Sequence, residues 1–262
     1  MKTFFHRAAP VIVLSLAALV GLRAQSPQAD VDTLIAEGDK ASTKQFDNKA
    51  ALEKFDQAFK LAPSNVEVLW RLSRTYVDIG EHLPATTDEE KKKQLETYEM
   101  SLDFANKAVA ANPSSSMAYT RRAIASGRIG LFKGVWDALD LVKQTRVDCE
   151  KALSLDPKNA SALYVMGRLH ARLIEKPKIV RWPLGIGWAN IEDAIKYYEL
   201  AIAARPEFIM YRLDVARVYV EDDNYAKAKE HLAKIDSISK QDEDDDQFRK
   251  EAKELSEKIK DK

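Results

Sequence analysis

The sequence predicts an all-α protein made of about five stacked helical hairpins. Four prolines each follow a similar helical phrase, such as AFKLAPSN and ALSLDPKN, with one small residue five positions before the proline and another ten positions after it. Small residues let two helices approach closely, and a proline cannot extend the helix that it follows, so each unit should be helix, stop, helix. The prolines are Pro63, Pro113, Pro157 and Pro206; the small residues are Ala58, Ala108, Ala152 and Ala201 before them, and Ser73, Ala123, Gly167 and Ala216 after them.

The composition agrees with this fold class. The chain has 262 residues, of which 45% are hydrophobic and 31% charged, with only nine glycines and nine prolines. These values suit long helices that bury one face and solvate the other. Without Lys2, Arg7 and Arg23 the chain carries 38 basic and 41 acidic side chains, so it lacks the basic excess of a nucleic-acid-binding protein.

Residues 1–24 have the pattern of a secretory signal peptide. Lys2 and Arg7 precede an apolar run from Ala8 to Leu22, no acidic residue occurs, and Ala24 offers a small residue for cleavage. We therefore expect an exported protein in a bacterial periplasm. The alternative is a retained membrane anchor, although the run of 15 residues is shorter than a spanning helix requires.

The hairpins follow in order along residues 25–235, the expected repeat domain. In the first, Ala51, Phe55 and Ala58 stand four and three residues apart, which places them on one stripe of a helix. The same spacing recurs in the later units. The expected hairpins are residues 30–61, 66–111, 116–155, 160–204 and 209–235.

Four segments depart from the plain repeat. Residues 83–96 predict a turn and a helix start capped by Thr87 or Asp88, and residues 127–144 predict an amphipathic extension of the third pair. Residues 176–190, with two prolines and two glycines, predict an apolar loop. Residues 236–262 predict an acidic linker, containing the acidic run 242–246, and a charged helix that covers the end of the stack.

This pattern resembles the tetratricopeptide repeat (TPR), a helix pair with a small residue in its first helix, alanines in its second and a closing proline. The resemblance implies a right-handed TPR superhelix. The proline spacings of 50, 44 and 49 exceed the usual repeat of about 34 residues, so the middle units carry insertions. With these insertions, residues 69–81, 123–134 and 188–208 are similar to the regulator of microtubule dynamics family of TPR proteins.

No motif for catalysis, a cofactor or a metal ion is found. The histidines are scattered, and nucleophile-elbow, phosphate-loop and dinucleotide motifs do not occur. His170 occupies the place of Tyr76 and Tyr219 in other units, which predicts a packed, hydrogen-bonded core residue. Cys149, the only cysteine, is interpreted as a small buried hydrophobic residue. We therefore expect a protein that is not an enzyme and needs no cofactor.

A second stripe on the first helices is the candidate binding surface. Arginines stand eleven residues after three of the prolines, each with an apolar residue one turn earlier; the third unit has Ile124 instead, with Arg121 and Arg128 nearby. The TPR resemblance implies that first helices line the concave groove, where arginines would bind an acidic extended peptide or a terminal carboxylate. The alternative is pairing within the chain, with Asp78, Glu150 or Asp214. The stripe comprises Trp70, Arg74, Tyr164, Arg168, Leu213 and Arg217.

Trp182 and Trp188 in the apolar loop allow two interpretations. They either fold back over the fourth helix pair as a lid, or contact a partner or a membrane interface, as clustered exposed aromatic residues do.

The functional hypothesis is a protein–protein interaction scaffold that binds a protein segment in the concave groove. One alternative is an accessory subunit of an envelope assembly that docks through its convex face and the apolar loop. The other is a membrane-anchored protein like the regulators of microtubule dynamics, if residues 1–24 are retained.

Overall fold

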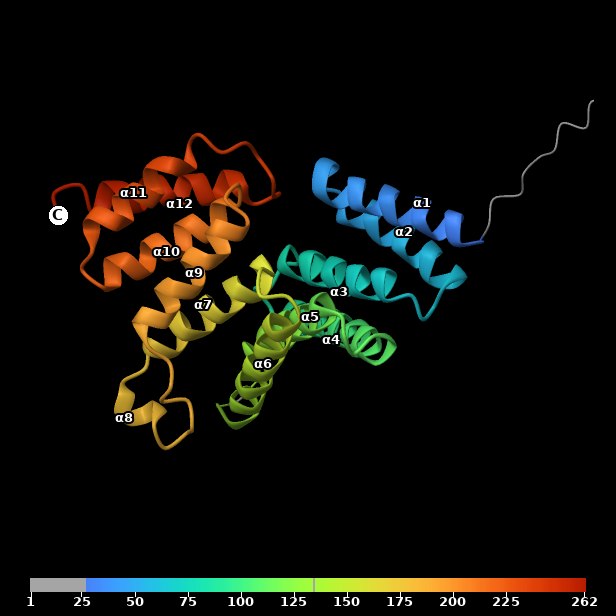
Figure 1. Ribbon diagram of the computed structural model, residues 1–262, viewed down its shortest axis with the longest axis horizontal. Coiled ribbons are helices and arrows are strands. Elements are labelled where there is room, and N and C mark those ends of the chain that lie inside the picture. The colour runs from blue at the N-terminus through green and yellow to red at the C-terminus, as the bar shows by residue number, and fades with distance from the viewer. Residues whose placement is uncertain (1–26, 134) are drawn as a thin grey trace, which may run out of the picture.

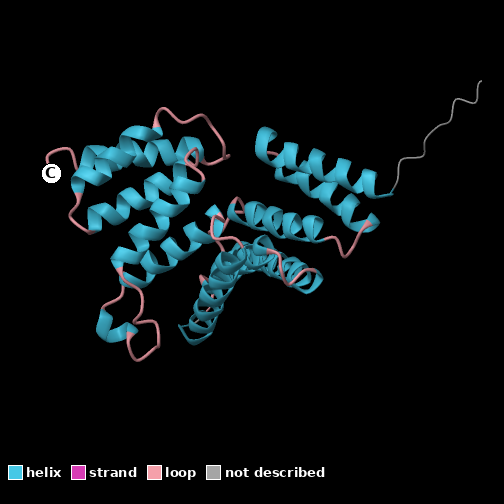
Figure 2. Cartoon of the chain, viewed as in Figure 1, coloured by secondary structure: helices cyan, strands magenta, loops and turns pink. Residues whose placement is uncertain are grey.

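The chain folds into helical hairpins that stack side by side, as the sequence predicts (Figure 1). The computed structural model describes residues 27–133 and 135–262, which contain helices and no strand (Figure 2). The hairpins pair α1 with α2, α3 with α4, α5 with α6, α7 with α9 and α10 with α11. The bounds are α1 Pro27–Lys40, α2 Asn48–Leu61, α3 Val66–Glu81, α4 Asp88–Ala111, α5 Ser116–Gly130, α6 Val135–Leu155, α7 Ala160–Ile174, α8 Lys178–Arg181, α9 Ile191–Ala204, α10 Ile209–Glu221, α11 Tyr225–Ile235 and α12 Asp245–Lys258.

A helix cap follows three of the four closing prolines by two residues. Asn65, Ser115 and Asn159 each accept a hydrogen bond from a backbone N–H of the first turn that follows. Such caps satisfy amide groups that have no partner inside the helix. In the fourth turn Phe208 takes this place without a side-chain hydrogen bond. Proline and cap together therefore end one helix and start the next.

Small residues sit where paired helices approach. The alanines five residues before the prolines are fully buried, as are Ser73, Ala123 and Ala216 after them. At Gly167 an added Cβ would lie 3.0 Å from the ring of Tyr198, and at Gly38 it would lie 2.5 Å from the ring of Phe55. Aromatic rings on the second helix thus fill the space that the missing side chain leaves open. The predicted packing register is confirmed.

The insertions lengthen helices and build one loop. Thr87 caps α4 in a reciprocal capping box with Glu90, which explains where this helix of 24 residues begins. Residues 176–190 form the predicted apolar loop, except for the single helical turn α8. Arg181 holds this loop together: its guanidinium donates to the carbonyl oxygens of Lys176 at 2.9 Å and Ala189 at 2.6 Å.

The C-terminal helix α12 packs against α10 and α11 and covers the last hairpin, as expected for a terminal helix. The acidic run before it folds into a turn, because the carboxylate of Asp245 accepts hydrogen bonds from the backbone N–H groups of Gln241 and Asp242. Asp245 is buried, so this part of the run is not the freely solvated linker that composition indicated. The proposed signal peptide, residues 1–24, lies outside the described residues.

Enlarging a buried alanine at a helix contact should destabilise the fold. We expect Ala201→Leu to lower the free energy of unfolding by about 1–3 kcal/mol, because Ala201 is fully buried between paired helices. Urea unfolding followed by circular dichroism measures the change. Ala203→Leu is the matched control, since Ala203 lies exposed on the same helix. Equal midpoints for the two variants would contradict the packing register.

Candidate functional site

The inner face of the stack encloses a cavity of about 700 Å³. Its wall comes mainly from the first helices α3, α5 and α7, with α6 and α10 contributing, and residues 241–244 border it. Apolar side chains such as Val77, Ile124 and Leu169 alternate with charged ones. The charged lining residues are Arg74, Arg121, Arg128, Arg168, Arg172, Arg205, His82, Asp78, Glu81, Glu175, Asp242, Glu243 and Asp244.

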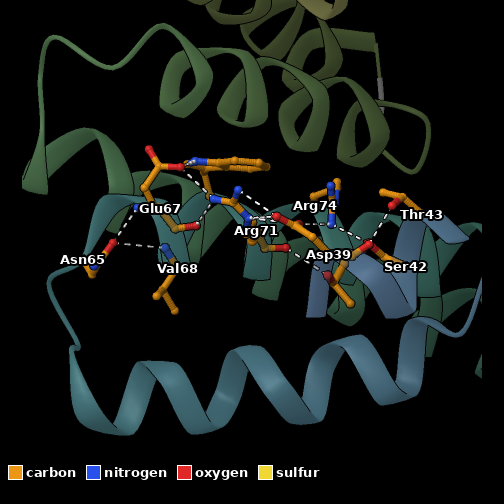
Figure 3. Close-up of polar contacts among 10 residues, drawn as sticks. Asp39, Ser42, Thr43, Asn65, Glu67, Val68, Arg71 and Arg74 are labelled. Atoms are coloured by element: carbon orange, nitrogen blue, oxygen red, sulfur yellow. Dashed lines mark hydrogen bonds and ion pairs between the residues drawn. The ribbon is translucent and has the colours of Figure 1, made fainter. Parts of the chain in front are cut away.

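Arg74 and Arg121 form the most unusual part of this lining. Arg74 donates from one terminal nitrogen to Asp39 at 3.2 Å and Ser42 at 2.7 Å, as Figure 3 shows. Its Nε atom and that of Arg121 are shielded from solvent and lack a hydrogen-bond partner. Burial, reinforced by the charge of Arg74, lowers the pKa of Arg121 to about 10. Two guanidinium groups therefore border the cavity with unused hydrogen-bonding capacity.

Trp70 supports these arginines. Its ring lies beneath the guanidinium of Arg71 at 4.1 Å, and those of Arg121 and Arg74 lie 5.6 and 5.7 Å from the ring centroid. Cations over an indole face are attracted to the ring. Trp70 is almost entirely buried, so it positions the arginines from behind and does not line the cavity.

Asp78 is the cavity-lining carboxylate that lies near this pair, farther from Arg74 than Asp39 is. One of its oxygens lies 4.0 Å from Nε of Arg74, too far for a hydrogen bond. Burial raises the pKa of Asp78 to about 7, although the charges of Arg74 and Arg121 oppose the shift. Near neutral pH, the carboxylate therefore neutralises only part of the positive charge.

Arg168 faces the same cavity from α7 with a neutral partner. It donates to the hydroxyl oxygen of Tyr164 at 2.9 Å, and that hydroxyl donates to Asp214 at 2.7 Å. Tyr164 stacks on Tyr211 with ring centroids 4.7 Å apart. Stacking and hydrogen bonds together hold Arg168 against the cavity wall.

The remaining residues of the predicted stripe lie elsewhere. Leu213 is fully buried in the core, so it offers no surface to a ligand. Arg217 lies outside the cavity lining; it pairs with Asp214 at 2.7 Å and with Glu251 of α12. Arg217 therefore pairs with acidic residues of its own chain, which was the alternative to binding a ligand. The structure brings together Arg74, Tyr164 and Arg168.

Residues 240–244, which we call the clasp, connect the two ends of the stack. The side-chain amide of Asn48 donates to Glu243 at 2.7 Å, and Nε2 of His82 lies 3.1 Å from a carboxylate oxygen of Asp244. Burial alone would lower the pKa of His82. Its hydrogen bonds to the Asp78 carbonyl and to Asp244, with the charge of Glu243, raise it to about 9. His82 is therefore cationic at neutral pH.

The two tryptophans of the apolar loop take different positions. Trp188 is half-buried; its ring meets His170 edge-on at 4.9 Å and lies beneath Arg146 at 4.2 Å. His170 is buried and accepts a hydrogen bond from the backbone N–H of Asn190. Trp182, in contrast, is 78% exposed. Trp188 thus has the place expected of a lid, and Trp182 that expected of an external contact.

The model of the protein family "Regulator of microtubule dynamics protein 1-3" matches residues 34–260, which are nearly all of the described chain. The chain belongs to this family. Regulator of microtubule dynamics protein 1 of mouse is 31% identical over 195 residues, covering 72% of this chain and 63% of the mouse protein. The bovine protein of the same name is 27% identical over 235 residues, covering 82% of this chain and 73% of the bovine protein. The match thus spans less than two thirds of the mouse relative.

A solved structure shows the same fold. A thermophilic TPR protein of Thermus thermophilus superimposes with a TM-score of 0.64 at 18% identity, covering 85% of this chain and 98% of that protein. At this identity the likeness concerns the fold alone. It confirms the expected architecture, a superhelix of TPR type.

The family relationship corrects the expected location. The curated relatives are regulators of microtubule dynamics from mammals, including mouse, cow and human, so the prediction of a bacterial periplasmic protein is wrong. Within residues 27–133 and 135–262, no helix is both long and apolar enough to cross a membrane.

Several cavity-lining residues lie outside the predicted binding stripe. Arg121 stands eight residues after its proline, one turn before the position that carries arginine in the other units. The acidic segment bordering the cavity comes from a distant part of the chain, so no repeat spacing could place it there. Asp78 was considered only as a pairing partner for arginine.

The clasp should loosen when His82 loses its charge. Because its pKa is raised from 6.5 to about 9, His82 contributes stability fully below pH 6.5 and loses it as the pH rises through about 9. We expect His82→Ala to speed amide hydrogen exchange in residues 241–246 at pH 7. Asp236→Asn, an exposed change just before this segment, is the control. Unchanged exchange in His82→Ala would show that the histidine contact does not hold the clasp.

Proposed function

We propose that this member of the family is a non-catalytic scaffold that binds an acidic protein segment in the central cavity. The observation that carries the proposal is the pair Arg74 and Arg121, whose shielded Nε atoms lack partners at the cavity wall. Leaving buried donors unpaired is unfavourable, and a ligand carboxylate would supply the missing acceptor. Binding would thus satisfy groups that the free protein leaves unsatisfied.

The dimensions and lining of the cavity favour an extended segment. A volume of about 700 Å³ holds a few side chains and cannot hold a folded domain. Val77, Ile124 and Leu169 would contact apolar side chains of the segment, while Arg168 on the opposite helix offers a second cation. The matching ligand is therefore a short peptide with acidic groups flanking an apolar residue.

Removing the unpaired cation should weaken binding. We expect Arg121→Gln to lower the affinity for a fluorescent acidic peptide about 10- to 100-fold, the equivalent of one charge-assisted hydrogen bond. Arg217→Ala should change the affinity little, because Arg217 lies outside the cavity lining. Fluorescence anisotropy at two ionic strengths measures both variants, with an amidated peptide, in which Asn and Gln replace Asp and Glu, as the ligand control. Equal losses in the two arginine variants would contradict a cavity site.

The affinity for an acidic peptide should also depend on pH. The pKa of Asp78 is about 7, so above this pH its negative charge opposes an incoming carboxylate, and below it the side chain is neutral. Affinity should therefore fall as the pH rises through 7. In Asp78→Asn the change in affinity around pH 7 should disappear, with tight binding retained at pH 8, where Arg121 and His82 are still charged. A pH profile identical to that of the unchanged protein would rule out Asp78 as its source.

Family membership favours a second candidate function. The relatives are named regulators of microtubule dynamics, and this chain matches their family over residues 34–260. In that case the described helices would act on microtubules directly or through a partner. Turbidity of assembling purified tubulin, measured with and without the protein, tests the direct form; an unchanged assembly curve would exclude it.

A further inference from the structure

Exposed apolar side chains gather at one edge of the molecule. Of the nine large hydrophobic residues that are exposed in the described part of the chain, four lie on two loops and a fifth lies in the first turn of the helix that follows one of them. One loop contains α8 and the other joins α5 to α6; both lie at the lower end of Figure 1. We call these five residues the apolar edge: Leu131, Trp136, Ile179, Val180 and Trp182.

The two loops are neighbours in space. Leu139 and Val142 of α6 pack in one hydrophobic cluster with Leu184, Ile186 and Ala189 of the loop that follows α8. Trp136 stands one turn before Leu139 on α6. This hydrophobic cluster thus holds the α8 loop next to the start of α6, and with it the two parts of the apolar edge.

The α8 loop presents its apolar side chains on a fixed support. Ile179 is 84% exposed and Trp182 is 78% exposed, although the backbone around them is ordered by the buried side chain of Arg181. Further hydrogen bonds run from the backbone N–H of Gly185 to the carbonyl of Trp182 and from that of Ile186 to the carbonyl of Arg181. A fixed conformation lowers the entropy lost when these side chains are buried by a partner.

The α8 loop itself carries a positive charge. Residues 176–190 contain three basic residues and no acidic one. Arg181 is turned inward, but Lys176 and Lys178 are exposed and make no side-chain hydrogen bond or ion pair among the described contacts. Basic residues beside exposed tryptophan and aliphatic side chains match a bilayer surface with anionic headgroups, where lysine stays at the headgroups and the apolar groups enter the interface.

We propose that the apolar edge docks on the surface of an anionic lipid membrane. The side chains of Ile179, Val180 and Trp182 would enter the interfacial region, and Lys176 and Lys178 would contact the headgroups. The edge favours an anionic membrane over a protein because exposed tryptophan and aliphatic side chains stand beside two exposed lysines, with no carboxylate in residues 176–190. This site is separate from the central cavity, so it does not depend on peptide binding there.

An environment-sensitive dye attached at the tip tests this proposal. Val180→Cys introduces an exposed thiol, and the only native cysteine, Cys149, is buried with its thiol pKa raised by burial, so it should not react. We expect the dye emission to increase and shift to the blue on vesicles of phosphatidylcholine with phosphatidylserine, and much less on phosphatidylcholine alone. A dye at Leu61→Cys, exposed at the end of α2, is the control that should not respond.

Two sets of substitutions complete the experiment in the full-length chain. Lys176→Glu with Lys178→Glu should lower partitioning onto the mixed vesicles at least 10-fold, at roughly fivefold per removed charge. Ile179→Ser with Trp182→Ser, assayed with the dye kept at position 180, should lower it at least 10-fold through lost apolar contact. Leu200→Ser is the matched exposed control on α9. Because the dye reports its own surroundings, binding through residues 1–24 alone would leave it unchanged.

Three results would overturn the proposal. No dye response at position 180 would mean that the edge does not meet the bilayer and serves a protein contact or none. An equal response at position 61 would show unspecific adsorption. An equal response on neutral vesicles, unaffected by the lysine changes, would exclude recognition of anionic headgroups.

Discussion

Close approach of the two helices within each hairpin is the constraint on which the rest of the structure depends. Where Gly167 faces the ring of Tyr198, or Gly38 the ring of Phe55, one side carries no side chain and the other carries a large flat one. The same packing of a small residue on one helix against a large ring on the other recurs along the chain, so successive hairpins have similar geometry and stack in a similar orientation. The concave face, and hence the cavity, results from this repetition.

The cavity combines apolar walls with guanidinium groups that the protein supports from behind. The ring of Trp70 and the network of Tyr164 with Asp214 use hydrogen bonds or π-electron density to hold arginines in place without fully neutralising them. Asp78 responds to the same surroundings, since burial raises its pKa even beside two cations. The positions of the arginines and the protonation of Asp78 therefore depend on the surroundings that these residues share in the cavity, and no single residue determines them.

Local chemistry in the sequence predicted most of the fold. Proline and small residues act within one or two turns, so their spacing located the hairpin boundaries and the register of packing, whereas the caps at the hairpin turns emerged from the structure. The site was harder to predict, because its geometry depends on which way side chains turn at the inner wall. Arg74, Arg168 and Arg217 all stand eleven residues after a proline. Arg217 nevertheless lies outside the cavity lining, where it pairs with Glu251 of α12. Arg121 enters from a position one turn earlier, because the third unit lacks arginine at the shared position.

The clasp has a consequence for the order of folding. Most contacts between helices lie within one hairpin or join neighbouring hairpins, so they connect segments that are close in the sequence. The contacts of Glu243 with Asn48 and of Asp244 with His82 join residues 195 and 162 positions apart, and they require every intervening hairpin to be in its final place. An error in the rise or twist of any unit would accumulate along the stack and separate these partners. Formation of the clasp thus requires that all the intervening repeats have assembled correctly.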